Sequence, residues 1–122
     1  MALVAGQHHL PAVVIALPAE IDMANASQVG RQLSAALAPG VRALIADMSA
    51  TTFCDSSGIS VLVGAHQQAA ADGIQLRLVV RSTAVLRALT VVQLDYLLAI
   101  YPSLSQALAA TPEEPGPPPS RE

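Results

Sequence analysis

One stretch of the chain, residues 41–80, decides the fold; its sequence is VRALIADMSATTFCDSSGISVLVGAHQQAAADGIQLRLVV. The apolar run over 41–48 predicts a buried strand, and the polar residues over 49–55 predict a loop. A helix is expected next, ending at Asp72-Gly73, and residues 74–80 predict a second strand. Because a crossover helix returns the chain in the same direction, these two strands are expected to be parallel.

The rest of the chain extends this pattern on both sides. A short run rich in Val and Ile over 12–17 predicts a strand, and residues 3–5 are expected to pair with it. Apolar residues spaced by four over 24–38, before Pro39-Gly40, predict an amphipathic helix. The remaining expected elements are a short helix that Ser82 or Thr83 caps, a last strand over 97–101 and a last helix over 103–110.

These elements predict an α/β fold with a mixed, mostly parallel sheet of four to five strands, packed with about four helices. A chain of 122 residues fits a single domain, which we place over residues 1–110. Residues 111–122, TPEEPGPPPSRE, contain five prolines and nothing to bury, so they predict an extended tail.

Side-chain patterns predict which faces are buried. The strand over 74–80 is expected to turn Leu76 and Leu78 one way, between polar Gln75 and Arg77. On the helix before it, one apolar face is expected to consist of Ile59, Leu62, Val63, His66 and Ala70.

Composition excludes several classes of function. Hydrophobic residues make up 52% of the chain and charged residues 12%, so most of it is expected to fold. Six arginines and no lysine face nine acids, a net charge of −3 that leaves no basic surface for nucleic acid. The mean hydropathy is +0.49, yet prolines and polar residues interrupt the uncharged stretch 1–19, so we expect no membrane insertion and a cytoplasmic protein.

Catalytic and metal-binding signatures are mostly missing from the sequence. Without lysine there is no phosphate-binding GKS or GKT loop. The histidines at 8–9, His66 and Cys54 lack the paired spacing of a zinc site, so no metal is expected. Nothing near Cys54 lowers its pKa, and Asp55 disfavours a thiolate, which predicts a small buried side chain and no nucleophile.

The informative motif is Cys54-Asp55-Ser56-Ser57-Gly58-Ile59, where the loop after the strand over 41–48 meets a helix. One interpretation is capping alone, because the oxygens of Asp and Ser accept from the unpaired N–H groups of a first helical turn. The other is a modifiable serine, since a helix dipole and free N–H groups tolerate a phosphate. A hydrolase elbow is disfavoured, because Ser57 lacks the Gly-x-Ser-x-Gly pattern.

Together with three other segments, this motif resembles the STAS domain, specifically the bacterial anti-sigma factor antagonists. The resemblance covers about residues 10–109. It rests on Ala19-Glu20-Ile21-Asp22, Leu44-Ile45-Ala46-Asp47, Asp55-Ser56-Ser57-Gly58-Ile59, and Tyr101-Pro102-Ser103-Leu104 followed by Ala107-Leu108.

The resemblance implies a regulatory protein and no enzyme. In that family an anti-sigma factor with kinase activity, of the GHKL ATPase type, phosphorylates the serine before the glycine, which here is Ser57. The unphosphorylated protein would bind that factor and release a sigma factor for transcription, and a separate serine phosphatase would reset it. The contact surface would include Asp22, Asp55, Ser56 and Gly58, and no cofactor would belong to the chain.

Two positions depart from the family pattern. Ala19 stands where a glycine usually precedes the Glu-x-Asp segment, and Gln93 stands where a glycine usually precedes Leu-Asp. Where such a glycine has a positive φ, its replacement is expected to strain the loop by about 1 kcal/mol.

Three alternatives remain open at this point. Ser56 belongs to the same first turn as Ser57 and is the other candidate phosphate acceptor. The chain could instead be a STAS subunit that docks on a transporter or a lipid-transport ATPase. It could also be an antagonist that works without phosphorylation and keeps the tetrapeptide as a helix cap.

Overall fold

A computed structural model describes residues 2–5 and 11–110, and of residues 2–5 only the backbone. The elements, in chain order, are β1 (Ala2–Ala5), β2 (Ala12–Ala16), β3 (Glu20–Ile21), α1 (Ala26–Ala35), β4 (Ala43–Met48), β5 (Phe53–Cys54), α2 (Ser56–Ala71), β6 (Gln75–Val80), α3 (Thr83–Val91), the 3₁₀ turn η1 (Leu94–Tyr96), β7 (Ala99–Tyr101) and α4 (Leu104–Ala109). The histidines at 8–9 and the expected tail over 111–122 lie outside the described residues.

The main sheet has five strands in the order β1-β2-β4-β6-β7. β2, β4, β6 and β7 run parallel, and β1 pairs with β2 in the antiparallel direction. The predicted α/β class, with a mostly parallel sheet and four helices, is confirmed. The predicted parallel direction of the strands on either side of α2 is also confirmed. β4 and β6 pair in parallel, with Leu44 opposite Leu76.

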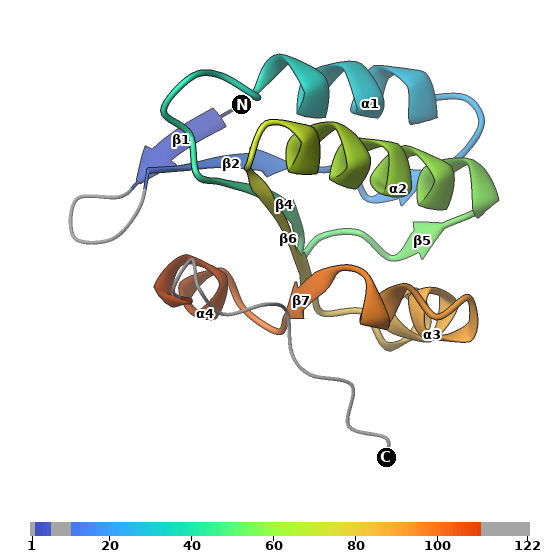
Figure 1. The fold of residues 1–122 in the computed structure, drawn as a ribbon. Helices are drawn as coiled ribbons and strands as arrows, with labels where there is room; N and C mark the ends of the chain where they lie inside the picture. The colour runs from blue at the N-terminus through green and yellow to red at the C-terminus, as the bar shows by residue number, and fades with distance from the viewer. Residues whose placement is uncertain (1, 6–10, 111–122) are drawn as a thin grey trace.

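The sheet separates two layers of helices (Figure 1). On one face α1 and α2 pack over alternate strand residues, among them Val13, Leu44 and Leu78, and bury Leu33 and Leu62 completely. On the other face the short helix α4 places Ala107 against Val14, Ile45 and Val79. α3 contacts β5 and η1 and adds Val85 and Leu89 to the larger of these two cores.

β6 departs from the predicted alternation, because both of its faces are buried. Leu76 and Leu78 face the α1–α2 layer as expected, but Arg77 on the opposite face is fully buried. Its guanidinium donates to the carbonyl oxygen of Ala107 at 2.7 Å, and its Nε donates to Oε1 of Gln75 at 2.7 Å. Arg77 therefore ties α4 to the sheet, which the strand pattern could not reveal.

The stripe that α2 buries is also rotated from the predicted one. Its buried residues are Gly58, Leu62, Ala65 and Ala69. Leu62 is buried as predicted, and the predicted Ile59 and Val63 pack against the core in part, whereas His66 is only half-buried and Ala70 is exposed. Small residues at these positions let α2 lie close to the sheet. The prediction followed the larger side chains and so missed that the closest-packed side of the helix is lined by glycine and alanine.

A second, two-stranded sheet was missed altogether. β3 and β5 pair in parallel, with Glu20 opposite Phe53 and Ile21 opposite Cys54. Both strands are only two residues long and lie in segments predicted as loops, because such short runs carry no measurable periodicity. The predicted helix over 24–38 is likewise shorter, since α1 ends at Ala35.

Gln93, between α3 and η1, is the one non-glycine residue with a positive φ in the described part of the chain, at 66°. This is the left-handed region, in which a Cβ atom crowds the backbone. The expected strain at the missing glycine is therefore confirmed at Gln93 and not at Ala19, where the described backbone needs no glycine.

Replacing Gln93 with glycine is expected to raise the free energy of unfolding by about 0.5–1 kcal/mol, because relief of the left-handed strain exceeds the added freedom of the unfolded chain. Gln93→Ala keeps the Cβ atom and should give no such gain. Urea denaturation of the three proteins checks this, and equal stability of Gln93→Gly and Gln93→Ala would contradict it.

The Cys54 thiol should make stability depend on alkaline pH. Burial, assisted by the charge of Asp55, raises the pKa of Cys54 from 9.0 to about 11 in the folded protein. The folded state thus holds the proton more tightly than the unfolded state, so this stabilisation is complete below pH 9 and is lost as pH rises toward about 11. Chemical denaturation between these pH values should show a steeper decline for the wild type than for Cys54→Ala, and parallel declines would refute the assignment.

Candidate functional site

The candidate site lies where β3 and β5 run side by side. A backbone hydrogen bond of 3.1 Å from the Asp55 N–H to the Ile21 carbonyl oxygen extends their pairing. Asp22 and Asp55 follow directly after these paired strands, and α2 begins at Ser56. The structure thus brings together the two segments, around Asp22 and around Ser57, that the family resemblance implies for one contact surface.

Asp55 caps α2. Its Oδ1 accepts hydrogen bonds from the Ser57 N–H at 2.9 Å and from the Gly58 N–H at 3.2 Å. The capping interpretation of the motif is therefore confirmed for Asp55. The expectation of free N–H groups at this helix start was wrong for two of them, because the Asp55 carboxylate already accepts hydrogen bonds from the Ser57 and Gly58 N–H groups.

Ser56 and Ser57 occupy the first turn of α2. Ser56 is exposed and Ser57 is half-buried. Within the described residues neither hydroxyl makes a hydrogen bond, so neither is committed to holding the fold together. Both hydroxyls thus remain chemically possible acceptors, and exposure alone does not choose Ser57 over Ser56.

Asp22 belongs to a small polar network that shapes the loop before α1. Its Oδ1 accepts from the Ala24 N–H at 2.9 Å, and its own N–H donates to Oδ1 of Asn25 at 3.0 Å. The Asn25 amide donates in turn to the Glu20 carbonyl oxygen at 2.8 Å. Asn25 is a positioning residue that the sequence analysis missed, although an Asn just before a helix is a known signal for such a turn.

Gly58 lies beneath the surface. A Cβ atom at this position would stand 2.6 Å from Sγ of Cys54 and 2.8 Å from Cγ2 of Ile21, closer than any side chain tolerates. Gly58 is thus required for the close approach of α2 to β3 and β5. Because it is buried, it supports the turn that bears Ser57 from below. Cys54 is buried in this contact, as predicted.

Two large apolar side chains flank the motif on the surface. Met23 is 82% exposed and Phe53 is 50% exposed. Phe53 directly precedes the Cys54-Asp55 pair, and Met23 directly follows Asp22. Both were missed as candidate contacts; the available signal was a large apolar residue next to one end of each of the two motif segments.

The described residues offer neither a metal-binding cluster nor a membrane-spanning helix. Among the described residues no group of three His, Cys, Asp or Glu side chains is placed to hold a metal ion. None of the helices over 11–110 has the length and apolar character needed to cross a bilayer.

Comparison with known proteins gives this site a context. The family model described as "STAS domain" matches residues 4–107. The anti-sigma-F factor antagonist RsfA of Mycobacterium tuberculosis is 30% identical over 109 residues, which cover 86% of this chain and 84% of RsfA.

Solved structures agree with that match. An anti-sigma factor antagonist from Mycobacterium paratuberculosis has a TM-score of 0.76 and 28% identity, covering 91% of this chain and 92% of its own. The fold is shared by the Bacillus cell fate determinant SpoIIAA in its phosphorylated form, with a TM-score of 0.62, 20% identity and coverage of 88% and 96%. The chain therefore belongs to the STAS domain family, in the group of anti-sigma factor antagonists.

Proposed function

We propose that this protein is a phosphorylation-controlled antagonist of an anti-sigma factor in the cytoplasm. Unmodified, it binds an anti-sigma factor that is also a serine kinase, and so releases a sigma factor for transcription. The kinase then phosphorylates Ser57, binding is lost, and a separate serine phosphatase restores the hydroxyl. The protein itself catalyses nothing and needs no cofactor.

The observation that carries this proposal is the state of Ser57. Its hydroxyl makes no hydrogen bond within the described residues, so a kinase can phosphorylate it without breaking a hydrogen bond of the fold. The turn that bears it is held in place by the Asp55 cap on one side and by the Gly58 contact on the other. An acceptor that is free to react on a rigid turn suits phosphoryl transfer, which depends mainly on positioning.

The charges around Ser57 suggest how the phosphate acts. A phosphoserine carries about −1.5 to −2 charges at pH 7. At position 57 it would add these charges beside the capping carboxylate of Asp55, and Asp22 follows the strand that pairs with the segment before Asp55. A partner surface that accepts a neutral hydroxyl there would have to desolvate an anion on binding, which is costly without a counter-charge.

The relatives support the same reading. SpoIIAA, which shares this fold, has been solved both in an unphosphorylated and in a phosphorylated form. RsfA, which is 30% identical to this chain, is named for antagonism of an anti-sigma factor. The alternatives of a transporter-docking subunit and of a phosphorylation-independent antagonist are outcomes of the tests below.

Phosphorylation is expected at Ser57 and at no other residue. The test is incubation of the purified protein with ATP and each candidate anti-sigma factor kinase of the source genome, followed by mass spectrometry for a gain of about 80 Da. Ser57→Ala should abolish the gain, while Ser56→Ala, its matched neighbour, should keep it. A gain that survives Ser57→Ala and disappears with Ser56→Ala would move the acceptor to Ser56.

Binding should depend on the same hydroxyl. The unmodified protein is titrated against the kinase that modifies it, without ATP, and compared with the fully phosphorylated protein. A change from 99:1 to 1:99 occupancy corresponds to about 10⁴-fold in affinity, and a loss of that order is expected. Equal affinities of both forms would leave a phosphorylation-independent antagonist, and no binding to any candidate kinase would favour the transporter-docking alternative.

A further inference from the structure

Exposed hydrophobic side chains gather on one segment of the surface. Five of the seven large hydrophobic residues that are exposed in the described chain fall within residues 86–97, on α3, on η1 and on the residue that follows each: Leu86, Val91, Val92, Tyr96 and Leu97. Val91 is the most exposed of these, at 73%. Apolar surface concentrated in this way is typical of a site where another molecule binds.

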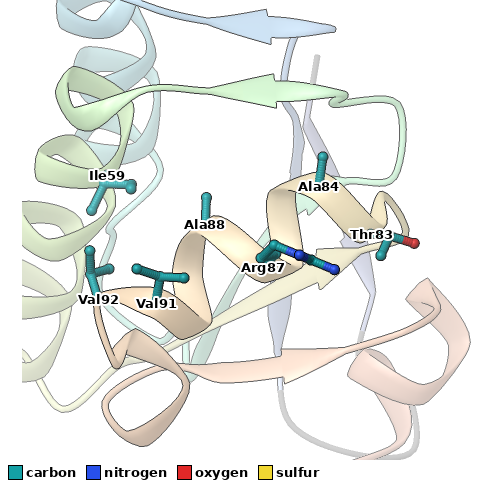
Figure 2. A pocket seen from close by; sticks show the side chains of 7 residues that line it. All are labelled: Ile59, Thr83, Ala84, Arg87, Ala88, Val91 and Val92. Carbon is teal, nitrogen blue, oxygen red and sulfur yellow. The ribbon is translucent and has the colours of Figure 1, made fainter.

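Part of this surface is hollowed into a groove of about 660 Å³ between α3 and the first turn of α2. Figure 2 shows its lining: Ile59 from α2, and Thr83, Ala84, Arg87, Ala88, Val91 and Val92 along α3 and its end. Five of these seven residues are aliphatic and none is aromatic. The lining therefore favours an aliphatic segment of a partner over stacked rings or a polar ligand.

The charge of the groove indicates which charged group a partner would present to it. Arg87 is the single charged residue of the lining, and it is exposed on α3. The surface around Ser57 has the opposite sign, because it carries Asp22 and Asp55. A molecule that docks in the groove is thus expected to present a carboxylate next to its aliphatic residues, where an arginine can bind it through two donors.

The groove begins at the N-terminal end of α2, the end that also bears Ser57. Ile59 stands two residues after Ser57 in the first turns of α2, and it lies across from Val91 and Val92 in Figure 2. The residue between them, Gly58, is the one held against β3 and β5. Ser57 and Ile59, two residues apart, project from different sides of α2, so a partner that covers the whole first turn of the helix reaches both the Ser57 hydroxyl and the valine end of the groove.

We propose that this groove is the second half of the anti-sigma factor interface: an aliphatic segment of that factor docks between Ile59 and α3 and places a carboxylate on Arg87. The inference rests on the proposed function, since it assigns the groove to the partner that acts on Ser57. It separates two tasks, because the groove supplies apolar contact and orientation while Ser57 supplies the switch.

The test measures affinity for the anti-sigma factor that phosphorylates Ser57, with unmodified protein and no ATP. Val91→Gln should weaken binding by about fivefold or more and Arg87→Glu by about tenfold or more. Two matched controls are exposed and lie outside the groove lining: Thr90→Gln on α3, and Arg81→Glu just before α3. Both should stay within about twofold of the wild type, and all four variants should keep the circular dichroism spectrum of the parent.

The outcomes are distinguishable. Wild-type affinity in Val91→Gln and Arg87→Glu would overturn the groove assignment and leave the Ser57 switch intact. Failure of every candidate anti-sigma factor to bind the wild type would overturn both. Sedimentation of the wild type alone as a dimer that Val91→Gln dissociates would also overturn the assignment, because a second copy of the chain would then occupy the groove.

Discussion

The site depends on one close contact, that of Gly58 with Cys54 and Ile21. A methyl group at position 58 would stand 2.6 Å from the Cys54 sulfur, so any larger residue would displace either α2 or the Cys54 and Ile21 side chains beneath it. This contact, with the Asp55 cap on the Ser57 and Gly58 N–H groups, fixes the direction in which the first turn of α2 leaves the sheet. The placement of the first turn of α2 next to the β3 segment that ends at Asp22, and of Ile59 across from α3, follows from it.

The groups that hold the first turn of α2 in place are different from the serine hydroxyls that the turn presents to solvent or to a partner. The residues that hold the turn bind through backbone N–H groups, a carboxylate and close packing, and none of them uses a serine hydroxyl. A phosphate on Ser57 therefore removes no structural hydrogen bond. What it changes is the charge of a surface on which Asp55 already occupies the N–H groups that could have neutralised an anion.

Much of this arrangement could be predicted from the sequence, because long apolar runs such as 41–48 and the Asp-Ser-Ser-Gly motif carry strong local signals. The succession of the main strands along the chain, their parallel direction and the capping role of Asp55 are of this kind. The β3–β5 pair, the burial of Arg77 and the groove beside α3 could not be predicted. Each depends on contacts between residues distant in sequence, and a two-residue strand or a lone buried arginine has no periodic pattern of its own.

The central claim is that phosphorylation changes the surface at Ser57 and leaves the turn beneath it intact. Amide hydrogen exchange tests this most directly, in protein made with phosphoserine at position 57 and in the unmodified protein. The account predicts protection of the Gly58 and Leu62 amides that agrees within about twofold between the two forms, because the cap and the glycine contact persist. Loss of protection by about tenfold or more at these amides would contradict it and would place the switch in the fold.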